Sequence, residues 1–277
     1  MYKLLSADFR RLIKSKLFWI LLFMMFFLSA GNMLNFCNRT KHLVPIRAIG
    51  LEEAWFMPVL LLGIFCAVFS GLFFGTEYSD GSIRNKLSVG HTRSSVYLAN
   101  LLLCFTATLS FALAALAGGL TGIPALGLWK LDISMLLLYL CLIILLSAAY
   151  SAIAAFISML CSNKAAASVI SILFILVLFV ASSRLDARLQ EPELTQNIII
   201  TAEDGMQWGE PVPNPLYVSG SLRLVLQFLM LLLPTGQGQQ IAYLNISQPV
   251  TALLCSIGIA VIVTAAGMLL FQKKDIR

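Results

Sequence analysis

Long apolar runs separated by short polar stretches dominate the 277-residue chain. A helix that crosses a bilayer needs about 20 mostly apolar residues. Six runs reach or approach that length, and none of them contains Asp, Glu, Lys or Arg. The sequence therefore predicts an all-α integral membrane protein whose six transmembrane helices form one domain, residues 17–277. The predicted spans are residues 17–36, 55–75, 97–123, 133–160, 166–183 and 250–271.

Two shorter segments are amphipathic or apolar without being long enough to span. The run Leu222–Leu233 ends just before a proline, which favours a re-entrant hairpin inside an extracellular segment, residues 184–249. Residues 1–16 place apolar side chains opposite basic ones, so we expect an interfacial helix in the headgroup plane. The alternatives are an ordinary basic flank or a cleaved signal peptide. The residues expected to form the interfacial helix are Leu5, Phe9, Arg10, Leu12 and Lys14.

Composition supports a membrane protein. Hydrophobic residues make up 59% of the chain and charged residues 12%, with a mean hydropathy of +0.89. Soluble domains carry about 25% charged residues. The six cysteines show no C-x-x-C spacing and are expected to be small packing residues. His42 and His91 lie far apart in sequence, which argues against a histidine zinc site.

The distribution of charge predicts the orientation. Alternate connections place twelve Lys and Arg with four acids on one side, and seven bases with nine acids on the other. Cytoplasmic loops carry the excess of Lys and Arg. Both termini are therefore expected in the cytoplasm, as six spans require. The net charge of +6 is read as a topology signal and not as a nucleic-acid surface.

The spans lack residues that would support several kinds of chemistry. Ion-coupled transporters place ionisable groups at membrane depth, and serine nucleophiles need a nearby base; the predicted spans offer neither. Glu52-Glu53 resembles the glutamate pair of membrane-embedded abortive-infection proteases, but Met57 stands where that family has Arg. We expect both glutamates in solvent outside the second span. A small-residue stripe in the third span, Ala114, Gly118 and Gly122, predicts close helix packing.

The loop at residues 76–96 is the most informative segment. Asp80 or Ser82 is placed to cap the start of a short helix, and Gly90 to end it. Ile83 and Leu87 then share one face, which suits docking into a groove on another protein. The alternative is a positive-inside loop with no partner.

The run Glu77-x-x-x-Gly81-Ser82-Ile83-Arg84-Asn85-Lys86-Leu87-Ser88-x-Gly90-x-x-Arg93 resembles the loop after the second helix of ABC-2 type transporter permeases. The layout of basic N-terminal helix, six spans and re-entrant segment is also similar. The resemblance implies a coupling helix that docks on a separate ATP-binding cassette subunit, with the interfacial helix nearby. It also implies a second permease chain, identical or not. ATP and Mg would bind in the partner, and no cofactor or metal in this chain.

Carried over residue by residue, the resemblance implies roles for six positions. Glu77 would lie at the end of the second span, where Arg84 or Arg93 could pair with it. The residues implied to contact the cassette are Gly81, Ser82, Ile83, Arg84 and Leu87.

We therefore expect a non-enzymatic subunit of an ATP-driven exporter in a bacterial cytoplasmic membrane. Because the spans are apolar, a hydrophobic or amphipathic cargo is expected: a peptide, a drug or a lipid. Two alternatives stay open, a regulatory membrane subunit and a lipid-modifying membrane enzyme. The enzyme would have to use the acids of the extracellular segment, which are Asp186, Glu191, Glu193, Glu203, Asp204 and Glu210.

Overall fold

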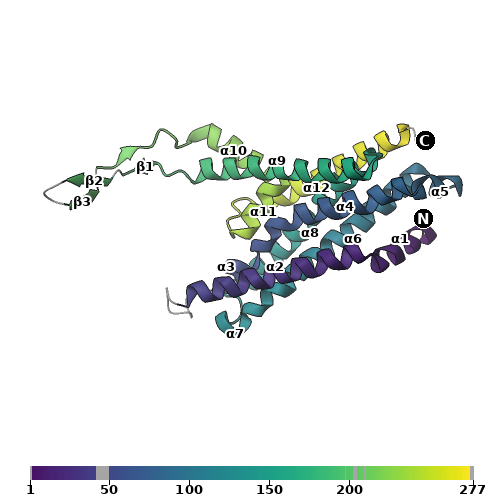
Figure 1. Ribbon diagram of the computed structural model, residues 1–277. Helices are drawn as coiled ribbons and strands as arrows, with labels where there is room; N and C mark the ends of the chain where they lie inside the picture. The colour runs from purple at the N-terminus through teal and green to yellow at the C-terminus, as the bar shows by residue number, and fades with distance from the viewer. Residues whose placement is uncertain (1, 42–49, 197, 202–204, 209, 275–277) are drawn as a thin grey trace.

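The structure, a computed structural model, describes residues 2–41, 50–196, 198–201, 205–208 and 210–274. It is a bundle of long helices from which a thin β ribbon projects (Figure 1). The first helices are α1 (Tyr2–Lys14), α2 (Lys16–Thr40), α3 (Glu52–Trp55), η2 (Met57–Leu61), α4 (Leu62–Ser79) and α5 (Ser82–Ser88). They are followed by α6 (Arg93–Gly119), η3 (Leu120–Gly122), α7 (Ile123–Leu126), α8 (Ile133–Leu160), α9 (Lys164–Gln190), α10 (Gly220–Leu232), α11 (Pro234–Ala242) and α12 (Pro249–Lys273).

Within the described residues, six helical segments are long and apolar enough to cross a membrane, which confirms the predicted number. The second begins at α3, three residues before the predicted start. Pro58 separates α3 from the longer α4 because proline lacks an N–H and belongs at the start of a helical segment. The six segments are Lys16–Thr40, Glu52–Ser79, Arg93–Leu126, Ile133–Leu160, Lys164–Gln190 and Pro249–Lys273.

Three helices form the centre of the bundle and three lie outside it. Helices α4, α6 and α8 contact one another, while α2 packs on α6, α9 on α4, and α12 on α8. The share of buried residues follows this order, at 67% and 61% for the α4 and α8 spans but 11% for the α12 span. The outer helices leave large apolar side chains exposed, among them Phe27, Val177 and Ile262. Lipid is the solvent that such surfaces require.

Close helix contacts are made at glycines. A Cβ on Gly118 would lie 2.4 Å from the Phe26 carbonyl oxygen, so α6 approaches α2 backbone to backbone. Gly122 is similarly close to Met33. A second pair, Gly71 and Gly75, faces α9: a Cβ on Gly75 would lie 2.7 Å from Lys164 Cα. This Gly-x-x-x-Gly spacing is the known signal for close packing of membrane helices, and it was missed in the sequence.

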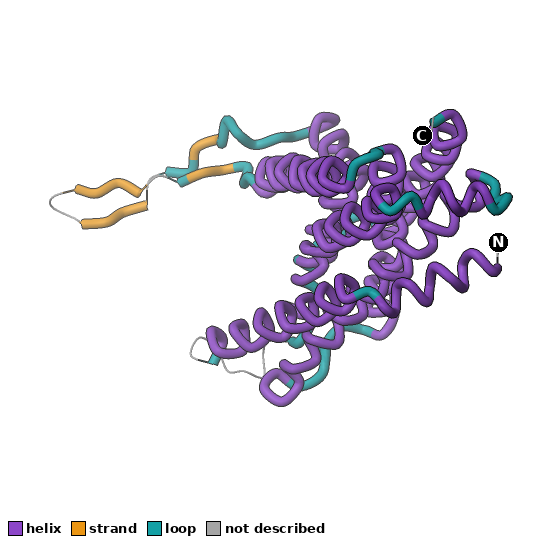
Figure 2. The backbone as a smooth tube through the Cα atoms, turned by 45° about the vertical axis from the view of Figure 1, so that its right-hand side comes forward, coloured by secondary structure: helices purple, strands orange, loops and turns teal. Residues whose placement is uncertain are grey.

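The two ends of the bundle differ. Both termini and α5 lie at one end, which we call the α5 end, and the strands, α3 and α7 lie at the other, the ribbon end (Figures 1 and 2). The ribbon consists of two antiparallel pairs, β1 with β4 and β2 with β3. The all-α prediction did not include these strands, which are β1 (Leu194–Thr195), β2 (Ile198–Thr201), β3 (Gly205–Trp208) and β4 (Val212–Pro213).

After the ribbon, α10 and α11 form a helical hairpin that returns to the bundle. The break between them lies at Leu233-Pro234, as the sequence suggested. Helix α11 is buried against η2, α8 and α9, even though it is rich in glutamine. Gln237 Nε2 donates to the Leu231 carbonyl at 2.6 Å, and Ser256 donates to Gln237 Oε1. Gln239 Nε2 donates to Ser183 Oγ at 2.7 Å. These bonds allow polar side chains to be buried here.

Candidate functional site

Glycines at both ends determine where α5 begins and ends. Gly81 is its N-cap residue, with a φ of 67°, and the Asn85 N–H bonds to the Gly81 carbonyl at 3.1 Å. No side chain caps this helix, so the predicted capping by Asp80 or Ser82 is wrong. Gly90 has a φ of 95° and its N–H bonds to the Leu87 carbonyl, as predicted for the helix end. Only glycine adopts such φ values without strain.

Ile83 does not face solvent. Its side chain is 1% exposed and packs with Leu4 of α1, Val96 and Tyr97 of α6, and Phe271 of α12. Leu87 is half-buried against the same cluster. The expectation that Ile83 and Leu87 form an outward docking face is therefore corrected: Ile83 anchors α5 to three other helices. The sequence could not show this, because the partners lie far away along the chain.

The outward face of α5 consists of Arg84, Asn85, Ser88 and Val89, while Gly81 and Ser82 are half-buried. Val89 is 80% exposed. A groove of about 610 Å³ separates this face from α1. Both helices contribute to its lining, which consists of Leu4, Ala7, Asp8, Arg11, Ser82, Asn85, Lys86, Val89 and His91.

A buried charge network lies beneath the groove. Glu77, at the end of α4, is fully buried and pairs with Arg11 of α1 and with Lys86 of α5 at 2.9 Å. Lys86 also pairs with Asp8 of α1 at 2.8 Å. Asn100 of α6 donates to Glu77 Oε2 at 3.0 Å. Two acids and two bases therefore balance across three helices, and Asn100 adds a fourth helix to the network.

The expected partners of Glu77 were wrong. Arg84 points outward, and Arg93 donates instead to the carbonyls of Phe271, Gln272 and Lys274, where it caps the end of α12. A cation at a helix C-terminus is favourable because the last carbonyls have no partner within the helix. Arg11 is a better partner for Glu77 because its guanidinium is also held by Thr76 Oγ1 at 3.1 Å.

Lys274 closes the end of α8 in the same way. Its ammonium donates to the carbonyls of Met159 and Cys161, at 3.1 and 3.2 Å, and lies 4.0 Å from the centroid of the Tyr78 ring. Burial lowers the pKa of Lys274 to about 8. Burial also raises the pKa of the Cys161 thiol.

Helix α1 packs on the bundle through Leu4, Asp8 and Leu12, which are buried. Of the other residues predicted for the interfacial helix, Leu5 and Phe9 are half-buried, whereas Arg10 and Lys14 are exposed. The chain bends at Ser15, whose hydroxyl accepts a bond from the Phe18 N–H at the start of α2. One face of α1 is thus fixed to α5 and α6.

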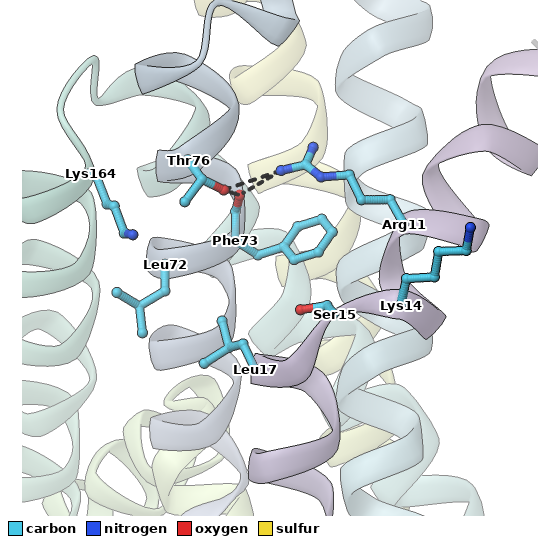
Figure 3. Close-up of a pocket in the computed structure, with 8 residues that line it drawn as sticks. All are labelled: Arg11, Lys14, Ser15, Leu17, Leu72, Phe73, Thr76 and Lys164. Atoms are coloured by element: carbon cyan, nitrogen blue, oxygen red, sulfur yellow. Dashed lines mark hydrogen bonds between the residues drawn. The ribbon is translucent and has the colours of Figure 1, made fainter.

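A pocket of about 420 Å³ opens beside this network, over α4 and between α1–α2 and α9 (Figure 3). Arg11 reaches across the Phe73 ring, with Cζ 4.6 Å from the ring centroid, and Lys164 extends in from α9. The lining residues are Arg11, Lys14, Ser15, Leu17, Leu72, Phe73, Thr76 and Lys164. A different groove of about 530 Å³, between α8, α9 and α12, is lined by apolar side chains.

The glutamates considered for proteolysis are separated by their surroundings. Glu53 is exposed as expected, but Glu52 is buried at 8% exposure and accepts a bond from the Lys130 N–H at 3.0 Å. Glu52 therefore ties α3 to the connection before α8, which corrects its predicted place in solvent.

The acids suggested for a lipid-modifying enzyme do not gather as far as the structure describes them. Asp186 accepts from Gln190, and Glu191 from Asn214, while Glu193 and Glu210 are exposed. Glu203, Asp204 and also His42 lie outside the described residues. Among the described residues, no three His, Cys, Asp or Glu side chains lie close enough to hold a metal ion.

A family model described as ABC-2 family transporter protein matches residues 4–182, which include all but the first two residues of α1, and α5 and the first four spans completely. No curated protein matches the sequence.

Proposed function

The chain belongs to the ABC-2 transporter family, and from this we propose that it is the permease subunit of an ATP-driven exporter whose ATP-binding cassette is a separate chain. The observation that carries the proposal is the way α5 is mounted. It is a short helix held by two glycines, buried on one face and exposed on the other, and joined by charge to α1 and α4.

Helix α5 has the properties of a coupling helix that transmits force. Its inner face is anchored by Ile83, and Lys86 ties it to both Glu77 and Asp8. A push on the outer face would therefore move α1, α4 and α6 together instead of bending a loop. Packed interiors transmit such displacement because they have little room to deform.

We place the cassette contact on Arg84, Asn85, Ser88 and Val89, with the groove toward α1 beside them. A partner that covers this face would bury Val89 among polar groups, which is the arrangement of an apolar contact with a polar rim. Gly81, Ser82 and Leu87, proposed from the family resemblance, are half-buried and support this face. Under this assignment the α5 end is cytoplasmic, in agreement with the excess of Lys and Arg there.

The proposed cargo is hydrophobic or amphipathic. The groove between α8, α9 and α12 offers about 530 Å³ with almost no polar surface, so it suits an apolar chain better than an ion. A second permease chain, which the family resemblance implies, would complete a path between the two subunits.

The experiment is copurification with the cassette ATPases encoded near the gene, using Val89→Glu as the test variant. Burying a carboxylate at the contact should reduce ATPase recovery at least tenfold, because an unpaired buried charge costs several kcal/mol. Val212→Glu is the matched control: Val212 is also exposed, at 44%, but lies at the ribbon end. Equal recovery with both variants, when both melt like the parent, would remove α5 as the contact.

A further inference from the structure

The basic pocket over α4 is not needed for the coupling role. It lies on the side of α4 that faces α1–α2 and α9 (Figure 3). The α5 groove lies elsewhere, between α1 and α5. Its lining combines three basic side chains with two hydroxyls and two leucines, and it contains no acid. Such a combination needs an explanation, because like charges placed around one cavity repel each other.

The ion pairs show which basic residues carry uncompensated positive charge. Arg11 is compensated by Glu77, and Lys86 by Asp8. Lys14 and Lys164 form no ion pair with any residue that the structure describes. The pocket thus holds two uncompensated cations beside a third that is fixed in position.

The cations are placed by the fold. Lys164 is the first residue of α9, and its Cα packs directly on Gly75, so its side chain starts beside Thr76. The Arg11 guanidinium lies over the Phe73 ring and bonds to Thr76 Oγ1. Lys164 begins its span and Thr76 lies near the end of its own, so the pocket is close to the span ends, where headgroups are expected.

The floor of the pocket continues along α4 as an apolar stripe. Thr76, Leu72, Val68 and Ile64 follow one another at four-residue spacing, and each is half-buried beside more deeply buried neighbours. Positions four apart lie on one face of a helix. A polar, basic upper end therefore leads into an aliphatic track that runs toward the middle of the span.

We propose that this pocket binds the phosphate of an anionic phospholipid, with one acyl chain along Leu72 and Val68. Lys164 and Arg11 hold the phosphate, and Lys14 at the rim adds to the positive potential. Basic pockets between membrane helices bind such headgroups through the same charge complementarity. The bound phosphate lies beside the Arg11 guanidinium, which joins α1 to α4 by pairing with Glu77. The phosphate therefore becomes a further partner in the charge network.

The test is lipid binding to the purified protein in detergent, followed by native mass spectrometry. The probes are palmitoyl-oleoyl phosphatidylglycerol, phosphatidylcholine with the same chains, and inorganic phosphate. We expect the phosphatidylglycerol to bind at least fivefold more tightly than the phosphatidylcholine. Inorganic phosphate at equal concentration should not displace it, because the acyl chain contributes to binding.

Two variants test the site itself. Lys164→Gln should weaken phosphatidylglycerol binding about fivefold, the size expected for one basic residue near an anionic headgroup. Lys16→Gln is the control, since Lys16 is exposed nearby but does not line the pocket. Leu72→Trp should also weaken binding, by filling the track while leaving every charge in place.

Three results would overturn the proposal. Equal effects of Lys164→Gln and Lys16→Gln would mean that the lipid responds only to the general surface charge. Unchanged binding in Leu72→Trp would remove the track, and displacement by inorganic phosphate would assign the pocket to a free anion. Lys164→Gln changes only an exposed side chain, so it tests the site even if Leu72→Trp fails to fold.

Discussion

The α5 end and the ribbon end of the bundle differ in the polar side chains that they bury. Both bury polar side chains among apolar helices. At the α5 end these are charged groups, Glu77, Asp8 and Lys86, that pair across helices. At the ribbon end Glu52 is buried as well, but the polar side chains buried around α11 are neutral, as in Gln237 with Ser256 and Gln239 with Ser183.

The difference concerns how strongly each end resists rearrangement. Separating buried opposite charges leaves each of them without a partner in a medium of low polarity, which is very unfavourable. Exchanging one neutral hydrogen bond for another costs much less. Under the proposed function, the α5 end would therefore move as one body, whereas the contacts around α11 would rearrange more easily.

Removing the central carboxylate is the strongest way to test this comparison. Glu77→Gln keeps the shape but removes the acid that pairs with Arg11, and it leaves Lys86 paired with Asp8. We expect a loss of about 3 kcal/mol in the free energy of unfolding, reduced somewhat because Arg11 is partly solvated. Thermal unfolding in detergent would measure it, and stimulation of the cassette ATPase should fall with it.

The control for that change is Glu53→Gln. Glu53 is exposed near the ribbon end, so its loss should change stability by less than about 0.5 kcal/mol. If the two variants melted at the same temperature, the charge network would not be what stiffens the α5 end.

Sequence patterns identified the spans and α5, but not the network. Apolar length alone determines a membrane helix. Gly90 marks the end of α5 as predicted, whereas the start lies at Gly81 and not at a cap by Asp80 or Ser82. The pairing of Glu77 with Arg11 spans 66 positions, and nothing local to either residue indicates it. The burial of Ile83 depends in the same way on α1 and α12.

Other errors came from signals that were weak or overlooked. The strands of the ribbon are two to four residues long and lie in a proline-containing segment. They are too short to show the alternation of apolar and polar residues that identifies a strand. The Gly71 and Gly75 pair carried a readable signal for packing against α9. That contact also determines where Lys164 lies in the basic pocket, because Gly75 allows α9 to begin beside Thr76.

The neutral hydrogen bonds around α11 give a smaller predicted effect. Gln237→Leu removes the donor to the Leu231 carbonyl and the acceptor for Ser256, both of which are buried. We expect a loss of about 1–2 kcal/mol, about half of that for Glu77→Gln. Adding Ser256→Ala should recover part of it, since the hydroxyl then no longer lacks a partner. A loss in Gln237→Leu as large as in Glu77→Gln would erase the distinction between the two ends.

The smallest predicted effect concerns pH and the amine of Lys274. Burial lowers the pKa of this amine from 10.5 to about 8, so between these values the unfolded chain binds more protons than the folded one. Stability must then rise with pH across this window, by linkage, to an extent limited because the side chain is partly solvated. Lys274→Met lacks this contribution. The melting temperature of the parent, relative to Lys274→Met, should therefore increase from pH 7 to about pH 9.5.

The opposite trend would be equally informative. If the parent lost its relative stability as pH rose, the bonds from the ammonium to Met159 and Cys161 would outweigh its burial. The charged form would then be the one that holds α8 and α12 together. Lys273→Met should show no such trend, since Lys273 is exposed one residue earlier. A pH-dependent difference in melting temperature for Lys274→Met, in either direction, combined with none for Lys273→Met, would show that the Lys274 charge acts at the helix ends it contacts. It would not then act through the overall basic character of the α5 end.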